Sequence, residues 1–190
     1  MVPRIEDRER PQRADARRNR ERILAAAKTI FAEQGIGAQM DDVARAAGVG
    51  VGTVYRHFPT KDALMERLVA QHFEAIIAIE REALTIADPW EAFATMIRSG
   101  AELMAADTHM RQAMLRFPDS AWEHARPENE IVDELGDRLI RRAQEAGALR
   151  PDFSVADMPM VMGGLCASIG VPGSDPQRLV EILLAGLRER

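Results

Sequence analysis

The stretch GVGVGTVYRHF at residues 48–58 combines residue types that could bring a backbone close to a phosphate. Glycines alternate at Gly48, Gly50 and Gly52, and free N–H groups at a helix start favour anions. A dinucleotide fingerprint, G-x-G-x-x-G, would need glycine at residue 53, which is Thr53. It would also need a strand before and a long helix after, so the pattern argues against a dinucleotide site.

A helix-turn-helix explains the same stretch better. Apolar spacing predicts one short helix over residues 40–47 and another over residues 51–57. Gly48 follows the first of them, where a left-handed residue permits a sharp turn. In this motif the second helix enters the major groove of DNA. Gly52 lies in its first turn, where a missing side chain would let the backbone approach a phosphate or a base edge.

The charge distribution suits a polyanionic partner at one end of the chain. The net charge is −5, yet residues 1–61 hold 12 Lys or Arg against 8 Asp or Glu. The remaining residues hold 13 against 22. A basic end on an acidic body is expected where only that end meets DNA, and a plain alternation of charged faces is the other interpretation.

Composition restricts the class of protein further. The single Cys166 excludes an intramolecular disulfide and a cysteine zinc site. The N-terminus is charged and lacks the apolar segment of a signal peptide, and the longest apolar stretch, residues 158–171, is too short to span a bilayer. We therefore expect a cytoplasmic protein without a membrane partner.

Helical periodicity and cap signals predict an all-α chain of roughly nine helices, without a convincing strand or repeat. A disordered arm is expected over residues 1–14. Helices are expected over residues 15–35, 40–47, 51–57, 61–85, 88–106, 108–116, 118–124, 127–147, 154–170 and 175–188. Thr60, Asp88 and Asp175 are the expected N-caps.

Residues 35–64 resemble the TetR family of one-component transcriptional regulators. The matching segments are Ala47-Gly48-Val49, Gly52-Thr53-Val54-Tyr55, His57-Phe58, and Lys61 with Leu64. The resemblance implies a homodimer in which residues 15–60 form the DNA-binding head and residues 61–190 form a body for ligand binding and dimerisation. The tail over residues 147–164 is more weakly similar to one actinobacterial-type subclass of C-terminal domains.

The same resemblance implies which residues contact DNA. They are Gln39, Arg45, Gly50, Val51, Gly52, Thr53, Tyr55, Arg56, His57 and Lys61. Thr53, Tyr55, His57 and Lys61 would contact the DNA backbone, and Gln39 is a weaker helix cap than the family's usual Thr or Ser. The resemblance places Gly50, Val51 and Gly52 at the base edges, and none of them has a polar side chain. We therefore expect specificity to depend on Arg45, Arg56, the N-terminal arm and DNA shape.

Structural roles remain as alternatives for part of this set. Phe58 is expected in the core of the head, and Tyr55 could also be a core aromatic residue. His57 could be an incidental surface residue, and the charged arm could be only a solvated tail. The arginines at positions 17, 18, 20 and 22 could contact phosphate.

The body is expected to contain an effector pocket and a dimer interface. The pocket residues are Phe93, Met96, Ile97, Met104, Met110, Met114, Phe117 and Trp122, because adaptable methionines suit irregular apolar ligands. Ordinary core filling is the alternative for each methionine. The interface residues, placed on the last two helices by the resemblance, are Met162, Leu165, Cys166, Ile169, Leu179, Ile182, Leu183 and Leu187.

The expected function is that of a sequence-specific repressor, released from a near-palindromic DNA operator by a small apolar or amphipathic effector. No cofactor and no metal are expected. A DNA-binding regulator controlled by a protein partner is the alternative. An enzyme built on His72, His109 and His124 with nearby carboxylates is disfavoured, because no H-x-x-x-H or E-x-x-H spacing and no nucleophile motif is present.

Overall fold

The structure, a computed structural model, describes residues 5–114, 117–123, 125–169, 171–173 and 175–189. Within these residues the chain is helical, and an isolated bridge between Leu149 and Arg188 is its one strand-like pairing. The α-helices are α1 (Ile5–Gln34), α2 (Met40–Ala47), α3 (Val51–His57), α4 (Lys61–Ala83), α5 (Pro89–Ala106), α6 (Thr108–Met114), α7 (Asp119–Glu123), α8 (Arg126–Glu145), α9 (Met158–Ser168) and α10 (Pro176–Leu187). Two 3-10 turns, η1 (Gly35–Gly37) and η2 (Val155–Asp157), precede α2 and α9. The expected all-α fold is confirmed.

Polar caps begin three of the longer helices, as the sequence predicts. Thr60, Asp88 and Asp175 each accept a hydrogen bond from the backbone N–H three residues later, at 3.0, 2.8 and 3.0 Å. Such a cap typically contributes about 1 kcal/mol of stability. The caps therefore fix where α4, α5 and α10 start. Among the described helices, none combines the length and apolar character needed to cross a bilayer.

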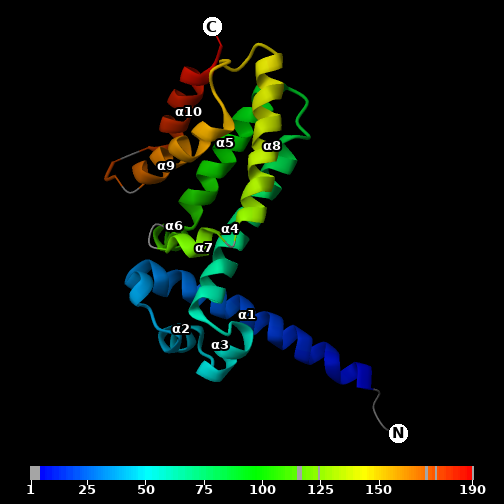
Figure 1. The fold of residues 1–190 in the computed structure, drawn as a ribbon, viewed down its shortest axis with the longest axis vertical. Helices are drawn as coiled ribbons and strands as arrows, with labels where there is room; N and C mark the ends of the chain where they lie inside the picture. Colours follow the sequence, from blue (N-terminus) through cyan, green and yellow to red (C-terminus); the bar gives the residue numbers. More distant parts are fainter. Residues whose placement is uncertain (1–4, 115–116, 124, 170, 174, 190) are drawn as a thin grey trace.

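The head consists of α1, α2, α3 and the first turns of α4 (Figure 1). Its core joins Ile23 and Phe31 of α1 to Val43, Val54 and Phe58, all of them buried. Phe58 therefore has the core position expected from the sequence. Because α3 is only seven residues long, this packing rather than its own helical stability must hold it in place.

The body packs around a second apolar core that draws on α5, α8, α9 and α10. Phe93 and Ile97 of α5 are at its centre, and Leu139 and Leu184 pack against them from α8 and α10. Helix α4 runs out of the head and along α8, so one continuous helix joins the two parts (Figure 1).

The head also contacts the body through α6 and the segment that follows it. Met110 and Ala113 of α6 are buried in the head's core. Phe117 packs edge-on against Phe31 of α1, with 5.7 Å between the ring centroids. The division into a head of residues 15–60 and a body of residues 61–190 stays a prediction, because the core of the head includes these residues of the body.

The expectation for the N-terminus was wrong in one respect. Helix α1 begins at Ile5, so residues 5–14 continue the helix that was expected to begin at residue 15. The segment is rich in glutamate and arginine, both good helix formers, and Pro11 falls in it without ending the helix.

Candidate DNA-binding face and ligand cavities

The turn between α2 and α3 depends on Gly48. Its φ is +64°, a left-handed conformation, and the N–H of the next residue, Val49, donates to the Ala44 carbonyl at 3.0 Å. A Cβ at this position would lie 2.8 Å from Nη2 of Arg22, and the same nitrogen donates to the Gly48 carbonyl at 3.3 Å. Glycine is therefore favoured here by the left-handed backbone, and a larger residue would also displace the end of the Arg22 side chain.

Helix α3 divides into an inner and an outer face. Val54 is fully buried, whereas Val51, Gly52, Tyr55 and Arg56 are exposed, Tyr55 to 48%. A Cβ added at Gly52 would meet no atom within 4 Å, so packing within the chain does not require glycine there. The outer face combines a small residue, an aromatic ring and a cation, which suits close docking on DNA.

The other residues expected at the DNA surround α3, and several are held by local contacts. Arg45 is exposed and lies 3.4 Å from Asp42. Gln39 makes no side-chain cap bond and donates instead to the Gly37 carbonyl at 2.9 Å. Lys61 donates to the Ala38 carbonyl at 3.2 Å. Gly50 is exposed, and Thr53 and His57 are partly buried, so α3 presents them less openly than Tyr55.

Two arginines of α1 support this face, and the sequence analysis gave them no individual role. The Arg20 guanidinium lies over the Phe58 ring, 5.7 Å from its centroid. Arg22 holds the turn through Gly48. The run of arginines at positions 17–22 was the available signal, but it does not distinguish phosphate contacts from contacts inside the head.

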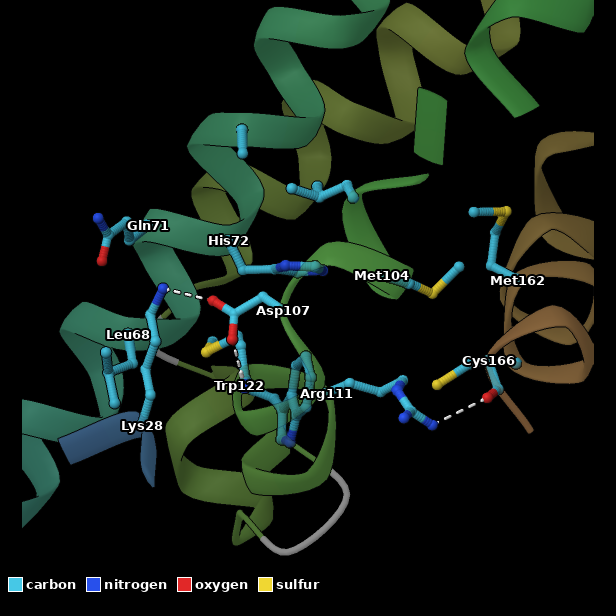
Figure 2. Close-up of a pocket in the computed structure, with 14 residues that line it drawn as sticks. Lys28, Leu68, Gln71, His72, Met104, Asp107, Arg111, Trp122, Met162 and Cys166 are labelled. Carbon is cyan, nitrogen blue, oxygen red and sulfur yellow. Dashed lines mark hydrogen bonds and ion pairs between the residues drawn. The ribbon is translucent and has the colours of Figure 1, made fainter. Parts of the chain in front are cut away.

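A first cavity lies where the head meets the body; we call it the junction cavity. Its volume is about 330 Å³, within the range of small-molecule sites. Leu68 and His72 of α4, Met104 of α5, Met110 of α6 and Cys166 of α9 are among the residues that line it. Figure 2 shows the side chains of Leu68, His72, Met104 and Cys166 around this space, on elements far apart in the sequence.

An ion pair between head and body lies in the wall of the junction cavity. Lys28 Nζ of α1 is 2.7 Å from Asp107 Oδ2, in the residue that follows α5 (Figure 2). Asp107 Oδ1 also accepts the Met110 N–H at 2.9 Å and so begins α6. Burial raises the pKa of Asp107, but the hydrogen bonds from Lys28 and Met110 outweigh it and lower the pKa below its ordinary value. The carboxylate is thus ionised at neutral pH.

Two further polar groups line the same space. Burial lowers the pKa of His72, with Asp107 opposing and Lys28 adding to the effect, so the imidazole is neutral at pH 7. Arg111 of α6 donates from Nη1 to the Cys166 carbonyl of α9 at 3.2 Å (Figure 2). A ligand in the junction cavity would therefore touch groups that connect α6 to both α1 and α9.

A second cavity, the inner cavity, extends into the body between α4, α5, α8 and the start of α9. Its volume is about 320 Å³. It is lined by Phe73, Trp122, Met96 and Met158, among others. The rings of Phe73 and Trp122 meet edge-on, with 6.3 Å between their centroids. The two cavities share five lining residues: His72, Leu103, Met104, Trp122 and Met162. The two cavities are therefore neighbours.

Glu80 of α4 is the notable polar group of the inner cavity. Its side chain is 2% exposed, and among the described residues it is the only charged residue that is buried. Its Oε2 has no hydrogen-bond partner there. Burial first, and then the negative charge of Asp133, raise the pKa of Glu80 to about 8. Glu80 was not among the residues predicted from the sequence, although its spacing from Phe73 and Ile77 places a charge on the apolar stripe of α4.

The structure separates the expected pocket residues into two groups. Met96, Met104, Met110 and Trp122 line one or both cavities. Phe93 and Ile97 line neither and lie fully buried in the core of the body, while Phe117 packs in the core of the head. Helix α5 is covered on more than one face, so its apolar spacing did not reveal which face meets a cavity. The side chain of Met114 lies outside the described residues.

The residues expected at a dimer interface also differ in position: some are buried or line a cavity, and others are exposed. Leu165 is buried within the chain, and Met162 and Cys166 line a cavity. Leu179, Leu183 and Leu187 are half-buried against the core of the body, and Ile169 is partly exposed. Ile182 is 58% exposed. The outward surface of α9 instead carries Met160, at 74% exposure, with Gly164 and Ala167. Helix α9 is apolar all round, so its composition did not reveal its orientation.

The described residues contain no group of three or more His, Cys, Asp or Glu side chains placed to hold a metal ion. Of the histidines considered for an enzymatic site, His72 lines both cavities and His109 is exposed. The position of His124 lies outside the described part of the chain.

Comparison with known proteins agrees with this architecture. Residues 23–68 match the family model described as bacterial regulatory proteins, tetR family. Residues 88–189, more than half of the chain, match the C-terminal domain described as transcriptional regulator SbtR-like.

Individual relatives and solved structures point the same way. The transcriptional repressor KstR of Mycolicibacterium smegmatis is 35% identical over a match that covers 69% of this chain and 65% of that protein, a little under two thirds. A TetR regulatory protein from Mycobacterium vanbaalenii is 34% identical, with 94% and 99% of the two chains covered and a TM-score of 0.65. The ketosteroid regulator KstR2 of Mycobacterium tuberculosis, at 20% identity and a TM-score of 0.73 over 90% of this chain and 95% of that one, shares the fold.

The helix-turn-helix head, the all-α body and these matches lead to one assignment. The chain belongs to the TetR family of DNA-binding transcriptional regulators, which are not enzymes, and its C-terminal domain is of the SbtR-like type.

Proposed function

We propose that the protein is a homodimeric repressor that a small apolar or amphipathic effector releases from a near-palindromic operator. The observation that carries this proposal is the junction cavity, which has the Lys28–Asp107 ion pair between head and body in its wall. A ligand placed there would act on the contact that sets the position of the head.

The proposed DNA contacts follow from the outer face of α3. Tyr55 and Arg56 are exposed beside Val51 and Gly52, and α3 lies at the end of the molecule opposite the C-terminus (Figure 1). In a two-fold dimer the two α3 helices would enter successive major grooves about 34–36 Å apart. Two-fold symmetry would require a near-palindromic operator.

The proposed release mechanism is a shift between two populations. Helix α6 contacts α1 through the core of the head and α9 through Arg111. An effector that fits the cavity better at one spacing of the two heads favours that spacing, and DNA that fits another spacing opposes the effector. Effector and operator must then weaken each other's binding by the same factor.

The proposed dimer interface uses the outward faces of α9 and α10. Met160, Gly164 and Ala167 present a mostly small apolar surface on α9, and Ile182 and Ala185 do so on α10. Small residues allow helices of two subunits to approach closely, and an exposed apolar surface of this kind is typical of interaction sites. The repressor name of the KstR relative supports the direction of regulation.

The first experiment is binding of the purified protein to DNA from upstream of its own gene, by mobility shift across a salt series. We expect saturable binding to a near-palindrome, loss of that binding in Tyr55→Ala, and a steep decrease with salt. The matched control is Ile131→Ala, which shortens an exposed apolar side chain on α8. Binding that Tyr55→Ala leaves unchanged would contradict the proposed DNA face.

A further inference from the structure

We propose that the inner cavity binds an amphipathic organic cation, with its ammonium head beside Glu80 and its apolar part against the methionines and aromatic rings. The inference rests on the proposed function, because it names the chemical class of the effector: its head group would lie in the inner cavity, and its apolar end would point toward the junction cavity along the residues that line both. The geometry of Glu80 points to it: a buried carboxyl group lines a ligand-sized cavity and one of its oxygens has no partner.

An unpaired buried carboxyl group lowers the stability of a protein, because ionisation there is opposed and a neutral acid still needs hydrogen bonds. Polar groups with no partner inside proteins call for an explanation, and an absent ligand is one. Glu80 is not needed to hold neighbouring helices together by an ion pair, since no Lys or Arg is among the described residues that line the inner cavity. A ligand cation would supply the missing partner.

The charges around the inner cavity favour a positive head group over a negative one. Asp133 of α8 also lines this cavity, and Asn129 donates to its Oδ2 at 3.2 Å. The remaining titratable group among the described lining residues is His72, which is neutral because burial lowers its pKa. The described residues that line the cavity thus contribute two carboxyl groups and no fixed positive charge, so an anionic ligand is disfavoured.

The walls suit the remainder of such a ligand. The rings of Phe73 and Trp122 offer apolar surface to the body of the ligand. Met96 and Met158 add flexible apolar surface that adapts to ligand shape. A longer apolar group could extend past Met104 toward the junction cavity, since both cavities share that residue.

Three compounds with one apolar body and different head groups test the proposal: 4-phenylbutylamine, 4-phenylbutanol and 4-phenylbutanoate. Binding is measured by calorimetry on the full chain. We expect the amine to bind about tenfold tighter than the alcohol, and the carboxylate to bind weakest. Glu80→Gln should reduce the affinity for the amine by about tenfold and leave that for the alcohol unchanged. Glu82→Gln, an exposed glutamate on the same helix, is the matched control and should bind as the unaltered protein does.

A second measurement follows the proton on Glu80. An ammonium group stabilises the ionised carboxylate, so binding of the amine near pH 7 should release a proton and tighten as pH rises from 6 to 8. Calorimetry in two buffers of different ionisation enthalpy counts that proton. The release should be absent in Glu80→Gln and present in Glu82→Gln.

The outcomes separate this inference from the proposed function. Equal or tighter binding of the alcohol would mean that neutral Glu80 donates to a ligand oxygen, and would overturn the cation site while leaving effector control intact. Failure of all three compounds to bind at millimolar concentration would also overturn it. Operator binding without any added compound, measured in parallel, tests the DNA-binding part of the proposed function alone.

Discussion

Replacement of Glu80 by glutamine should stabilise the protein, and the gain should grow with pH. Glutamine has the same shape as a protonated glutamate but never ionises. The pKa of Glu80 is raised from its ordinary 4.5 to about 8 in the fold, so the folded protein holds this proton over a pH range in which the unfolded chain has lost it. The contribution of protonated Glu80 to the stability of the fold is fully present below pH 4.5 and is lost as the pH rises through about 8.

The size of the effect follows from the same values. Each pH unit between the two pKa values changes the free energy of unfolding by about 1.4 kcal/mol. The unaltered protein should therefore lose about 3 kcal/mol between pH 4.5 and pH 7 through this group, and about 5 kcal/mol by pH 9. For a chain of this size, about 3 kcal/mol corresponds to roughly 6–12 °C in Tm.

The assay is thermal or urea unfolding of the unaltered protein, Glu80→Gln and Glu82→Gln at pH 5, 7 and 9. The difference between each variant and the unaltered protein isolates one residue, because all other groups titrate in common. Glu80→Gln should match the unaltered protein within about 1 kcal/mol at pH 5 and exceed it increasingly above. Glu82→Gln, which alters an exposed side chain, should show no such trend. A difference that is the same at all three pH values would refute the argument that Glu80 is neutral in the fold.

Three other changes test the head, its link to the body, and the dimer. Lys28→Met should cost about 1 kcal/mol of stability and weaken the effector's influence on DNA binding, and a double-mutant cycle with Asp107→Asn should show a coupling of similar size. Gly48→Ala should cost about 1–2 kcal/mol, because a residue with a Cβ is strained at a φ of +64°, and should weaken operator binding by displacing the Arg22 side chain that holds the turn; calorimetry and mobility shift measure the two effects. Ile182→Glu should convert dimers to monomers in analytical ultracentrifugation, because it places a charge on an exposed apolar face of α10.

Matched variants control two of these changes. Gly50→Ser should fold as well as the unaltered protein, since the φ of Gly50 is −69° and the space around it is open. Ile131→Glu places the same charge on the exposed surface of α8 and should leave the dimer intact. Additive effects of Lys28→Met and Asp107→Asn would mean that the ion pair does not couple α1 to α6. Dimers that persist in Ile182→Glu would place the interface elsewhere.

Local signals in the sequence predicted much of the fold because they act over a few residues. The side-chain oxygens of Thr60, Asp88 and Asp175 each meet a backbone N–H three residues away, so the cap can be recognised without tertiary structure. Gly48 is recognisable in the same way, since many helices end in a left-handed residue and glycine adopts that conformation most easily. The starts of these helices and the turn of the head could therefore be predicted from the sequence.

The cavities were less predictable because they depend on which faces of several helices meet. Phe93 and Met96 are both apolar and lie three residues apart on α5, yet only Met96 lines a cavity. The Lys28–Asp107 pair joins residues 79 positions apart, a distance at which no spacing rule applies. Glu80 could have been found by asking which charges fall on an apolar stripe.

Helix α9 lies between the cavities and the proposed subunit contact, so only the thickness of one helix would separate the two. Met162 and Cys166 border the cavities on one side, and Met160 and Gly164 form part of the proposed subunit contact on the other. Packed helices lie about 8–10 Å apart, so the two effector sites of a dimer would be divided by little more than a pair of α9 helices. Occupancy of one site would then be coupled to occupancy of the other through this pair of helices. Effector titrations of the dimer should accordingly depart from independent binding at two equal sites.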